Sequence, residues 1–232
     1  MSPVTLYLVR HGAIIAVAKK AYIGQIEAPL SEEGVEQAWA LRRWLEPLSL
    51  SRALASDLSR SQRTARIIMG RRAGVVEPVP TLREINLGEW EGFSFEEIRE
   101  KFPEAYAARG CDIEHFRPPR GESFADCRER VEASLHKILD GSRGNVLMVG
   151  HAGVNRLILC SILGIPVQNL HSIGQDYGCL NVIEFGPDRT RVQLMNFSPH
   201  TPRSPKPASH RLAAKHTGKV KSGNTSEVAT CQ

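Results

Sequence analysis

Two short apolar runs end in the same way, and together they constrain the fold more than any other feature of the chain. Leu6–Val9 precedes Arg10, His11 and Gly12, and the run at 146–149 precedes Gly-His-Ala-Gly. An apolar run of this length without alternation is typical of a strand buried on both faces of a sheet. Such a sheet needs helices over each face, so the two runs predict an α/β protein.

The remaining pattern alternates strands and helices, which predicts parallel pairing through right-handed crossovers. We therefore expect a three-layer α/β/α sandwich with a mostly parallel central sheet. The strand-free stretch at 93–140 predicts a helical cap insertion over the active site. Further strands are expected at 52–56, 74–80, 179–185 and 191–197, and helices at 31–45, 57–69, 94–101, 104–109, 123–140 and 152–163.

Local signals fix the start of two of these helices. Ser31 is the expected cap of the first helix, whose apolar stripe comprises Ala38, Leu41, Trp44 and Leu45. Asp57 or Ser59 is the expected cap of the second helix.

The net charge of +5 is concentrated at the C-terminus. Positions 199–232 hold six basic residues and one acidic residue, leaving, from totals of 30 and 25, 24 of each for positions 1–198. The tail has no apolar periodicity and no aromatic residue for base stacking. We predict a globular domain at 1–198, a basic disordered tail at 199–232, and no nucleic-acid partner.

Cysteine usage and hydropathy bear on location. The five cysteines are odd in number and scattered without metal-ligand spacing, which predicts no metal site and no disulfide framework, and favours a reducing cytoplasm. No cofactor is expected. The N-terminus lacks the pattern of a signal peptide. The longest apolar run, 157–165, is too short to span a bilayer, so no membrane association is expected.

The two histidines that follow the apolar runs are the candidate chemical groups. Neighbouring parallel strands would bring His11 and His151 to one crevice at the carboxyl edge of the sheet. Arg10 and Arg60 would supply positive charge there, which indicates a bound anion. Each has a structural alternative: a histidine that only donates a hydrogen bond, an ion pair for Arg10, and a solvated helix face for Arg60.

Four ordered segments carry a resemblance to a known family. They read LVRHG at 8–12, SDLSR at 56–60, LREINLGEWEG at 82–92 and VGHAGV at 149–154. In order and spacing they resemble the histidine phosphatase (phosphoglycerate-mutase-like) superfamily over about residues 5–197. The order of four segments is more specific than the Arg-His-Gly signature alone.

The resemblance implies a role for each candidate residue. His11 matches the nucleophile that forms a phosphohistidine, while Arg10, Arg60 and His151 match the pocket around the phosphoryl oxygens. Glu84 matches the proton donor, with Glu89 and Glu91 in the same loop as competitors. Such a cluster transfers a phosphoryl group without a metal, since positioning and charge stabilisation supply most of the catalysis.

Two further segments favour the small phosphatase branch that includes alpha-ribazole phosphatases of cobalamin assembly. They are GQIEAPLS at 24–31, where Glu27 replaces the usual Asp, and PPRGES at 118–123. One segment departs from the family: positions 13–17 read AIIAV instead of a polar pair followed by Asn. This apolar segment predicts an apolar pocket mouth that fits a bulky or aromatic leaving group, or else weakened catalysis.

The sequence thus predicts a metal-independent phosphomonoesterase that acts on a small phosphorylated metabolite, with alpha-ribazole 5′-phosphate as the candidate substrate. Two alternatives remain open. One is a mutase that returns the phosphoryl group to a second hydroxyl, and the other is a catalytically idle phosphate-binding module. The sequence carries no signal of oligomeric state.

Overall fold

The two apolar runs form adjacent parallel strands inside the sheet, β1 (Val4–Arg10) and β4 (Gly144–Gly150). Alternate side chains of β1 enter different cores: Leu6 and Leu8 pack on one face, Tyr7 and Val9 on the other. Both faces are therefore apolar and need covering. The computed structural model describes residues 3–15, 21–72 and 74–200.

Within the described residues, six strands form one sheet in the order β3-β2-β4-β1-β5-β6. The first four of these pair in parallel, whereas β5 is antiparallel to β1 and to β6. The mostly parallel sheet is confirmed, and β5 and β6 are antiparallel because a short turn joins them directly. The remaining strands are β2 (Leu50–Ala55), β3 (Val76–Pro78), β5 (Leu180–Phe185) and β6 (Thr190–Phe197).

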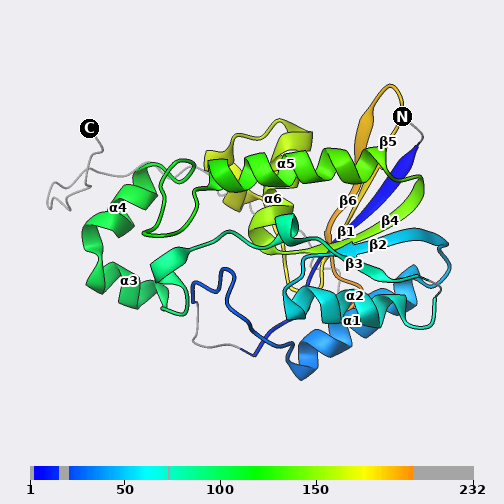
Figure 1. Ribbon diagram of the computed structural model, residues 1–232, viewed down its shortest axis with the longest axis horizontal. Coiled ribbons are helices and arrows are strands. Elements are labelled where there is room, and N and C mark those ends of the chain that lie inside the picture. Colours follow the sequence, from blue (N-terminus) through cyan, green and yellow to red (C-terminus); the bar gives the residue numbers. More distant parts are fainter. Residues whose placement is uncertain (1–2, 16–20, 73, 201–232) are drawn as a thin grey trace, which may run out of the picture. The chain divides into compact units, whose positions relative to one another are not determined.

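Helices cover both faces of the sheet and complete the predicted three layers (Figure 1). α1 (Glu32–Leu45) and α2 (Ser59–Met69) pack on the face that carries Tyr7 and Val9. α5 (Phe124–Asp140) and α6 (Ala152–Leu163) pack on the opposite face.

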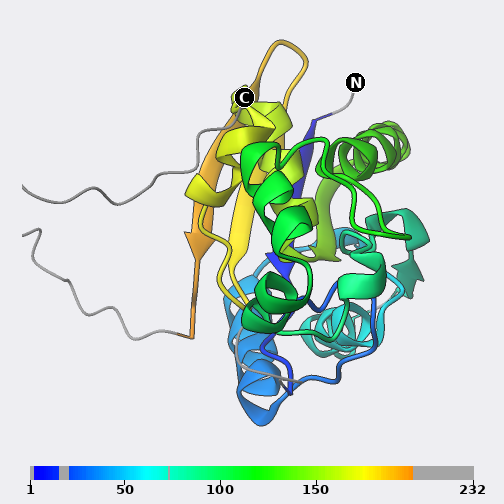
Figure 2. The same ribbon diagram turned by 90° about the vertical axis from the view of Figure 1, so that its left-hand side faces the viewer.

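The helical insertion is smaller than the expected 93–140. α3 (Phe95–Lys101) and α4 (Pro103–Cys111) extend away from the sheet (Figure 1); α3 buries Ile98, and α4 buries no residue. Figure 2 shows the same two helices from the side of the insertion. α5 instead belongs to the helical layer, because its buried stripe, which includes Val131, joins the core of the sheet. Three short 3-10 turns complete the described elements: η1 (Pro80–Leu82), η2 (Gly88–Trp90) and η3 (Val167–Ser172).

Two local predictions about α1 and α2 need correction. Ser31 caps α1 as expected, accepting the Gly34 N–H, but Trp44 is 39% exposed and contacts the Phe197 ring instead of the core. α2 is preceded by Leu58, which makes no side-chain cap. Asp57 is unavailable for capping because its carboxylate forms an ion pair with Arg83 at 2.6 Å. Glu27, from a distant loop, accepts the Ser59 N–H in its place.

Some of the predictions made from the sequence concern residues outside the described ones. This applies to the predicted tail from position 201 onward and to Ala16 and Val17 of the apolar segment. None of the described helices is long and apolar enough to cross a membrane. Cys127, Cys160 and Cys179 are buried free thiols.

Candidate active site

A pocket of about 230 Å³ opens where β1 and β4 end, at the carboxyl edge of the parallel strands. Arg10, His11, Arg60 and Glu84 line it, and His151 lies behind His11. The five residues selected from the sequence come from four separate segments of the chain. The fold brings all five together.

His11 is the first residue after β1, and its backbone is fixed on both sides. Its N–H donates to the Gly150 carbonyl and its carbonyl accepts the Gly178 N–H, both at 3.1 Å. The ring Nδ1 lies 2.8 Å from the Gly12 carbonyl, which can only accept, so Nδ1 carries the proton. The lone pair is therefore on Nε2.

The side chain of His11 is only 4% exposed. Burial is the main cause that lowers its pKa well below the ordinary value, and the charges of Arg10 and Arg60 lower it further. His11 is therefore a neutral imidazole at neutral pH, the form that can act as a nucleophile.

His151 directly precedes α6 and is fully buried. Its ring meets the edge of the His11 ring at a centroid distance of 5.0 Å. Nε2 lies 3.2 Å from the Ser61 hydroxyl, whereas Nδ1 is buried without a hydrogen-bond partner among the described residues. Burial, followed by the proximity of His11 and Arg60, lowers the pKa of His151 well below its usual range.

Arg60 lies in the first turn of α2 and is 1% exposed, whereas Arg63 and Arg66 on the same helix are exposed. The solvated-face alternative is therefore wrong for Arg60. Its guanidinium donates to the carbonyls of Ile26 at 2.7 Å and Gly24 at 2.6 Å. A buried cation held by neutral carbonyls keeps its full charge for an anion in the pocket.

Arg10 closes β1 and stacks its guanidinium 3.7 Å above the centre of the Tyr177 ring. Its Nη1 donates to the Gln175 carbonyl at 2.5 Å. Within the described part of the chain, neither Arg10 nor Arg60 forms an ion pair with a carboxylate. The buried Nε atoms of both arginines also lack partners there. Unpaired buried donors of this kind favour an anionic ligand.

Glu84 places its carboxylate at the N-terminus of α6. It accepts the N–H groups of Gly153 at 3.0 Å and Val154 at 3.3 Å. The close contact explains the glycine, because a Cβ at position 153 would lie 2.6 Å from the Glu84 carboxylate. The competing acids are engaged elsewhere: Glu89 pairs with Arg120 at the surface, and Glu91 accepts backbone N–H groups of two loops.

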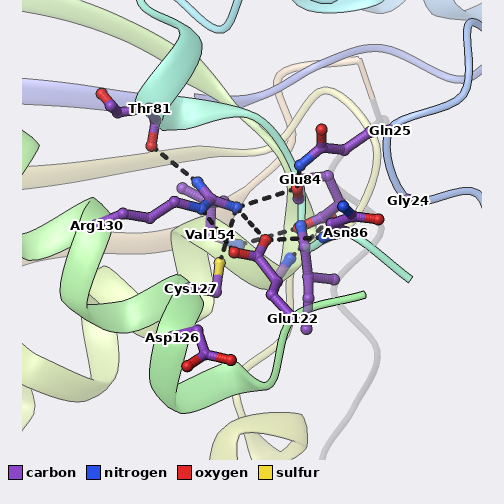
Figure 3. Close-up of polar contacts among 12 residues, drawn as sticks. Gly24, Gln25, Thr81, Glu84, Asn86, Glu122, Asp126, Cys127, Arg130 and Val154 are labelled. Carbon is purple, nitrogen blue, oxygen red and sulfur yellow. Dashed lines mark hydrogen bonds and ion pairs between the residues drawn. The ribbon is translucent and has the colours of Figure 1, made fainter. Parts of the chain in front are cut away.

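The loop that carries Glu84 is held by Arg130 from α5 (Figure 3). Arg130 donates to the carbonyl of Thr81 at 2.8 Å and to that of Glu84 at 3.1 Å. It also forms an ion pair with Glu122, whose carboxylate accepts the Asn86 N–H at 2.8 Å. Glu122 belongs to the PPRGES segment, so this motif ties the loop to α5.

Gly12 and Gly34 interlock the end of β1 with the start of α1. A Cβ on Gly12 would lie 2.3 Å from the Gly34 carbonyl oxygen, and a Cβ on Gly34 would lie 2.0 Å from that of Ala13. Any larger residue at either position must push the two backbones apart. The Gly12 N–H also donates to the Thr64 hydroxyl at 3.2 Å, which links the loop to α2.

Sequence reasoning missed several residues of the pocket. Tyr177 follows η3 in an irregular stretch with no periodicity, and the arginines at 109 and 156 lie on helices without any motif. The apolar segment contributes Ile14, which lines the pocket mouth, while Ile15 is 58% exposed. The other lining residues missed from sequence are Ala21, Tyr22, Ile23, Ile85, Leu87, Phe95, Phe124 and His171.

Comparisons with known proteins agree with this fold and pocket. The family model described as "Histidine phosphatase superfamily (branch 1)" matches residues 6–198. The chain is 31% identical to the adenosylcobalamin/alpha-ribazole phosphatase of Escherichia coli (strain K12), over 82% of this chain and 95% of that protein. It is also 31% identical to the "Probable phosphoglycerate mutase GpmB" of Erwinia tasmaniensis, over 70% and 76% of the two chains.

Solved structures of phosphatases have the same fold as this chain. The alpha-ribazole phosphatase from Shigella flexneri superposes with a TM-score of 0.78 at 30% identity, covering 83% of this chain and 96% of that one. Together with these relatives, the three-layer fold and its pocket identify the chain as a phosphatase, an enzyme that hydrolyses phosphoric esters. The chain belongs to branch 1 of the histidine phosphatase superfamily.

Proposed function

We propose that the chain is a metal-independent phosphomonoesterase that works through a phosphohistidine on His11. The single observation that carries the proposal is the state of the His11 ring, which is buried, neutral and held through Nδ1 with Nε2 left available. Arg10 and Arg60 supply the positive charge that stabilises the phosphoryl group during its transfer. Among the described residues, no group of three or more His, Cys, Asp or Glu side chains is placed to hold a metal ion.

In the first step, Nε2 of His11 attacks phosphorus and the bond to the ester oxygen breaks. Arg10, Arg60 and His151 bind the phosphoryl oxygens during this transfer. The departing oxygen is a poor alkoxide and takes a proton from the Glu84 carboxyl group. The products are the free alcohol, phosphohistidine and the Glu84 carboxylate.

In the second step, the Glu84 carboxylate takes a proton from a water molecule whose oxygen attacks phosphorus. The N–P bond breaks, inorganic phosphate is released and neutral His11 is restored. We expect the proton on Nδ1 to stay in place throughout, because Nδ1 donates it to the Gly12 carbonyl.

The proposed substrate is alpha-ribazole 5′-phosphate. The support is the identity of 31% over 192 residues to a phosphatase named for alpha-ribazole, together with the resemblance of the 24–31 and 118–123 segments to that branch. The aromatic and aliphatic side chains at the pocket mouth suit an apolar leaving group. A reducing cytoplasm is the location proposed with this function.

The test is release of inorganic phosphate from alpha-ribazole 5′-phosphate, with sugar phosphates and 3-phosphoglycerate in parallel. Quenching the reaction with ³²P-labelled substrate should trap an acid-labile phosphoenzyme in the wild-type protein and none in His11→Ala. His115→Ala is the matched control, because His115 is exposed and pairs with Asp112 outside the pocket.

Three outcomes would overturn parts of the proposal. No phosphate release and no phosphoenzyme would identify an idle binding module. Transfer of the trapped phosphoryl group to a hydroxylated acceptor, with little loss to water, would identify a mutase. Unchanged turnover in His11→Ala would remove His11 from the nucleophilic role.

A further inference from the structure

The outer wall of the pocket holds a second group of basic side chains that the proposed chemistry does not use. Arg109 from α4, Arg156 from α6 and His171 from η3 all line the same cavity as His11. Among the described residues, none of the three forms an ion pair with a carboxylate. Three elements that are distant in sequence thus each place a basic side chain without a carboxylate partner in the wall of the same pocket.

The three groups lie close enough to affect one another. His171 is exposed at the pocket wall, and its pKa is lowered by partial loss of solvation first, and then by the charges of Arg156 and Arg109. Arg156 is fixed by a hydrogen bond of 2.9 Å from its Nε to the Ile173 carbonyl, and this bond leaves both terminal nitrogens for other partners. Mutual repulsion among cations is relieved when an anion binds between them.

The charge balance of the pocket leads to the same conclusion. Four arginines line it, and its one acidic group, Glu84, is protonated at the start of the proposed first step, so the formal charge with neutral histidines is +4. A phosphomonoester dianion supplies a charge of about −2 near neutral pH. Two positive charges in a partly closed cavity are then left without a counterion, so the ligand that fits best carries further negative charge.

Aromatic side chains stand beside the basic group. The Tyr22 and Phe95 rings lie 4.5 Å apart, and the Arg109 guanidinium lies 5.7 Å from the centre of the Tyr22 ring. On the other side, Phe124 contacts His171 at a centroid distance of 6.4 Å. The wall therefore combines a flat apolar surface with positive charge.

We infer that Arg109, Arg156 and His171 form a subsite for a second anionic group on the leaving group of the substrate. The leaving group has an apolar or aromatic body that rests on Tyr22 and Phe95, and it ends in a carboxylate or a second phosphate. This inference rests on the proposed function, because it uses the same pocket with the phosphoryl group at His11. It keeps the phosphohistidine chemistry of the proposed function but differs on the substrate: alpha-ribazole 5′-phosphate has an uncharged leaving group, so we expect it to react more slowly than an amphipathic phosphomonoester with two anionic groups.

The experiment compares two aryl phosphates that differ in one charge, 4-carboxyphenyl phosphate and 4-carbamoylphenyl phosphate. The wild-type protein should hydrolyse the carboxylate with the higher kcat/KM, by about tenfold or more, the range of a hydrogen bond to a charged group. Arg109→Gln and Arg156→Gln should bring the ratio close to one. Arg63→Gln is the control, since Arg63 is an exposed arginine outside the pocket. An arm with 1,4-phenylene bisphosphate distinguishes a second phosphate from a carboxylate.

Binding measurements separate this inference from the proposed function. Titration calorimetry of the same two esters on His11→Ala gives their affinity ratio without turnover. If the wild-type protein hydrolyses neither ester but His11→Ala binds the carboxylate ester more tightly, the subsite stands and the phosphatase proposal fails. An affinity ratio of one, or an equal loss for both esters in Arg109→Gln and Arg156→Gln, would overturn the subsite.

Discussion

The two ends of the pocket are built in different ways. The inner end consists of residues at strand ends and helix starts, and His11, Arg60 and His151 are 4%, 1% and 0% exposed. The outer end includes residues of α3 and α4, where Ile98 is the buried residue of α3 and α4 has none. The groups proposed for the chemistry thus come from the sheet edge, while two of the groups proposed to select the leaving group, Phe95 and Arg109, come from a lightly anchored insertion.

The largest expected effect comes from removing the proposed acid at the inner end. Glu84→Gln should lower kcat/KM for an alkyl phosphate by about a thousandfold, within the range of general acid catalysis. A leaving group of low pKa, such as p-nitrophenolate, departs without a proton, so its kcat/KM should fall far less. Steady-state kinetics with both esters measure the difference. Equal losses would show that Glu84 does not protonate the leaving group.

The next effect tests charge at the inner end. Arg60→Met should lower kcat/KM by about 10²–10³ with every phosphomonoester, because one preorganised cation is removed from the developing phosphoryl charge. Arg66→Met is the matched control, since Arg66 is exposed on the same helix. A loss confined to one leaving group would instead assign Arg60 to substrate selection.

The hydrogen bonds from Arg130 that hold the Glu84 loop can be weakened by a substitution that leaves Glu84 unchanged. Arg130→Lys keeps the charge beside Glu122 but loses the planar fork that reaches Thr81 and Glu84 together. We expect kcat/KM for the alkyl phosphate to fall about tenfold, and that for p-nitrophenyl phosphate to change little. Arg128→Lys on the same helix is the control. A uniform loss for both esters would mean that Arg130 only stabilises the fold.

Acidification should reveal the burial of the two histidines. The folded pKa values of His11 and His151 lie well below their unfolded value of about 6.5, so below about pH 6.5 the unfolded chain binds protons that the folded chain does not. The free energy of unfolding should therefore fall, by roughly 1 kcal/mol per histidine at about pH 5.5. Urea denaturation at two pH values should show a smaller fall for His11→Gln than for the wild type.

The smallest effect is expected at the outer end. Phe95→Ala removes a ring that is already 39% exposed, so the free energy of unfolding should change by less than about 1 kcal/mol. For an aryl phosphate, KM should rise severalfold with kcat nearly unchanged, because the ring contacts the leaving group and not phosphorus. A large fall in kcat would show that the insertion takes part in the chemistry, as the inner end of the pocket does.

The sequence predicted the inner end better than the outer end for a physical reason. His11 and His151 follow apolar strands directly, and parallel neighbours in a sheet end at one edge, so local pattern was enough to bring them together. Arg109 lies on α4 and His171 on η3, and the connections that bring these two elements to the pocket have no periodicity from which their path could be predicted. The cap is smaller than the sequence predicts, because the apolar stripe of α5 has the pattern of any amphipathic helix and does not indicate which layer the helix joins.

The close contact between Gly12 and Gly34 means that a position outside the pocket can be as sensitive to mutation as a position that lines it. Every residue of α1 is described, and none lines the pocket. Even so, Gly34 allows no side chain without displacing the backbone that follows His11. In a saturation screen for activity, position 34 should therefore be as intolerant as the pocket itself, while its neighbours on the exposed side of α1 accept most replacements. A map of such a screen would show position 34 among the most sensitive positions, although it lies in a helix that lines no part of this pocket.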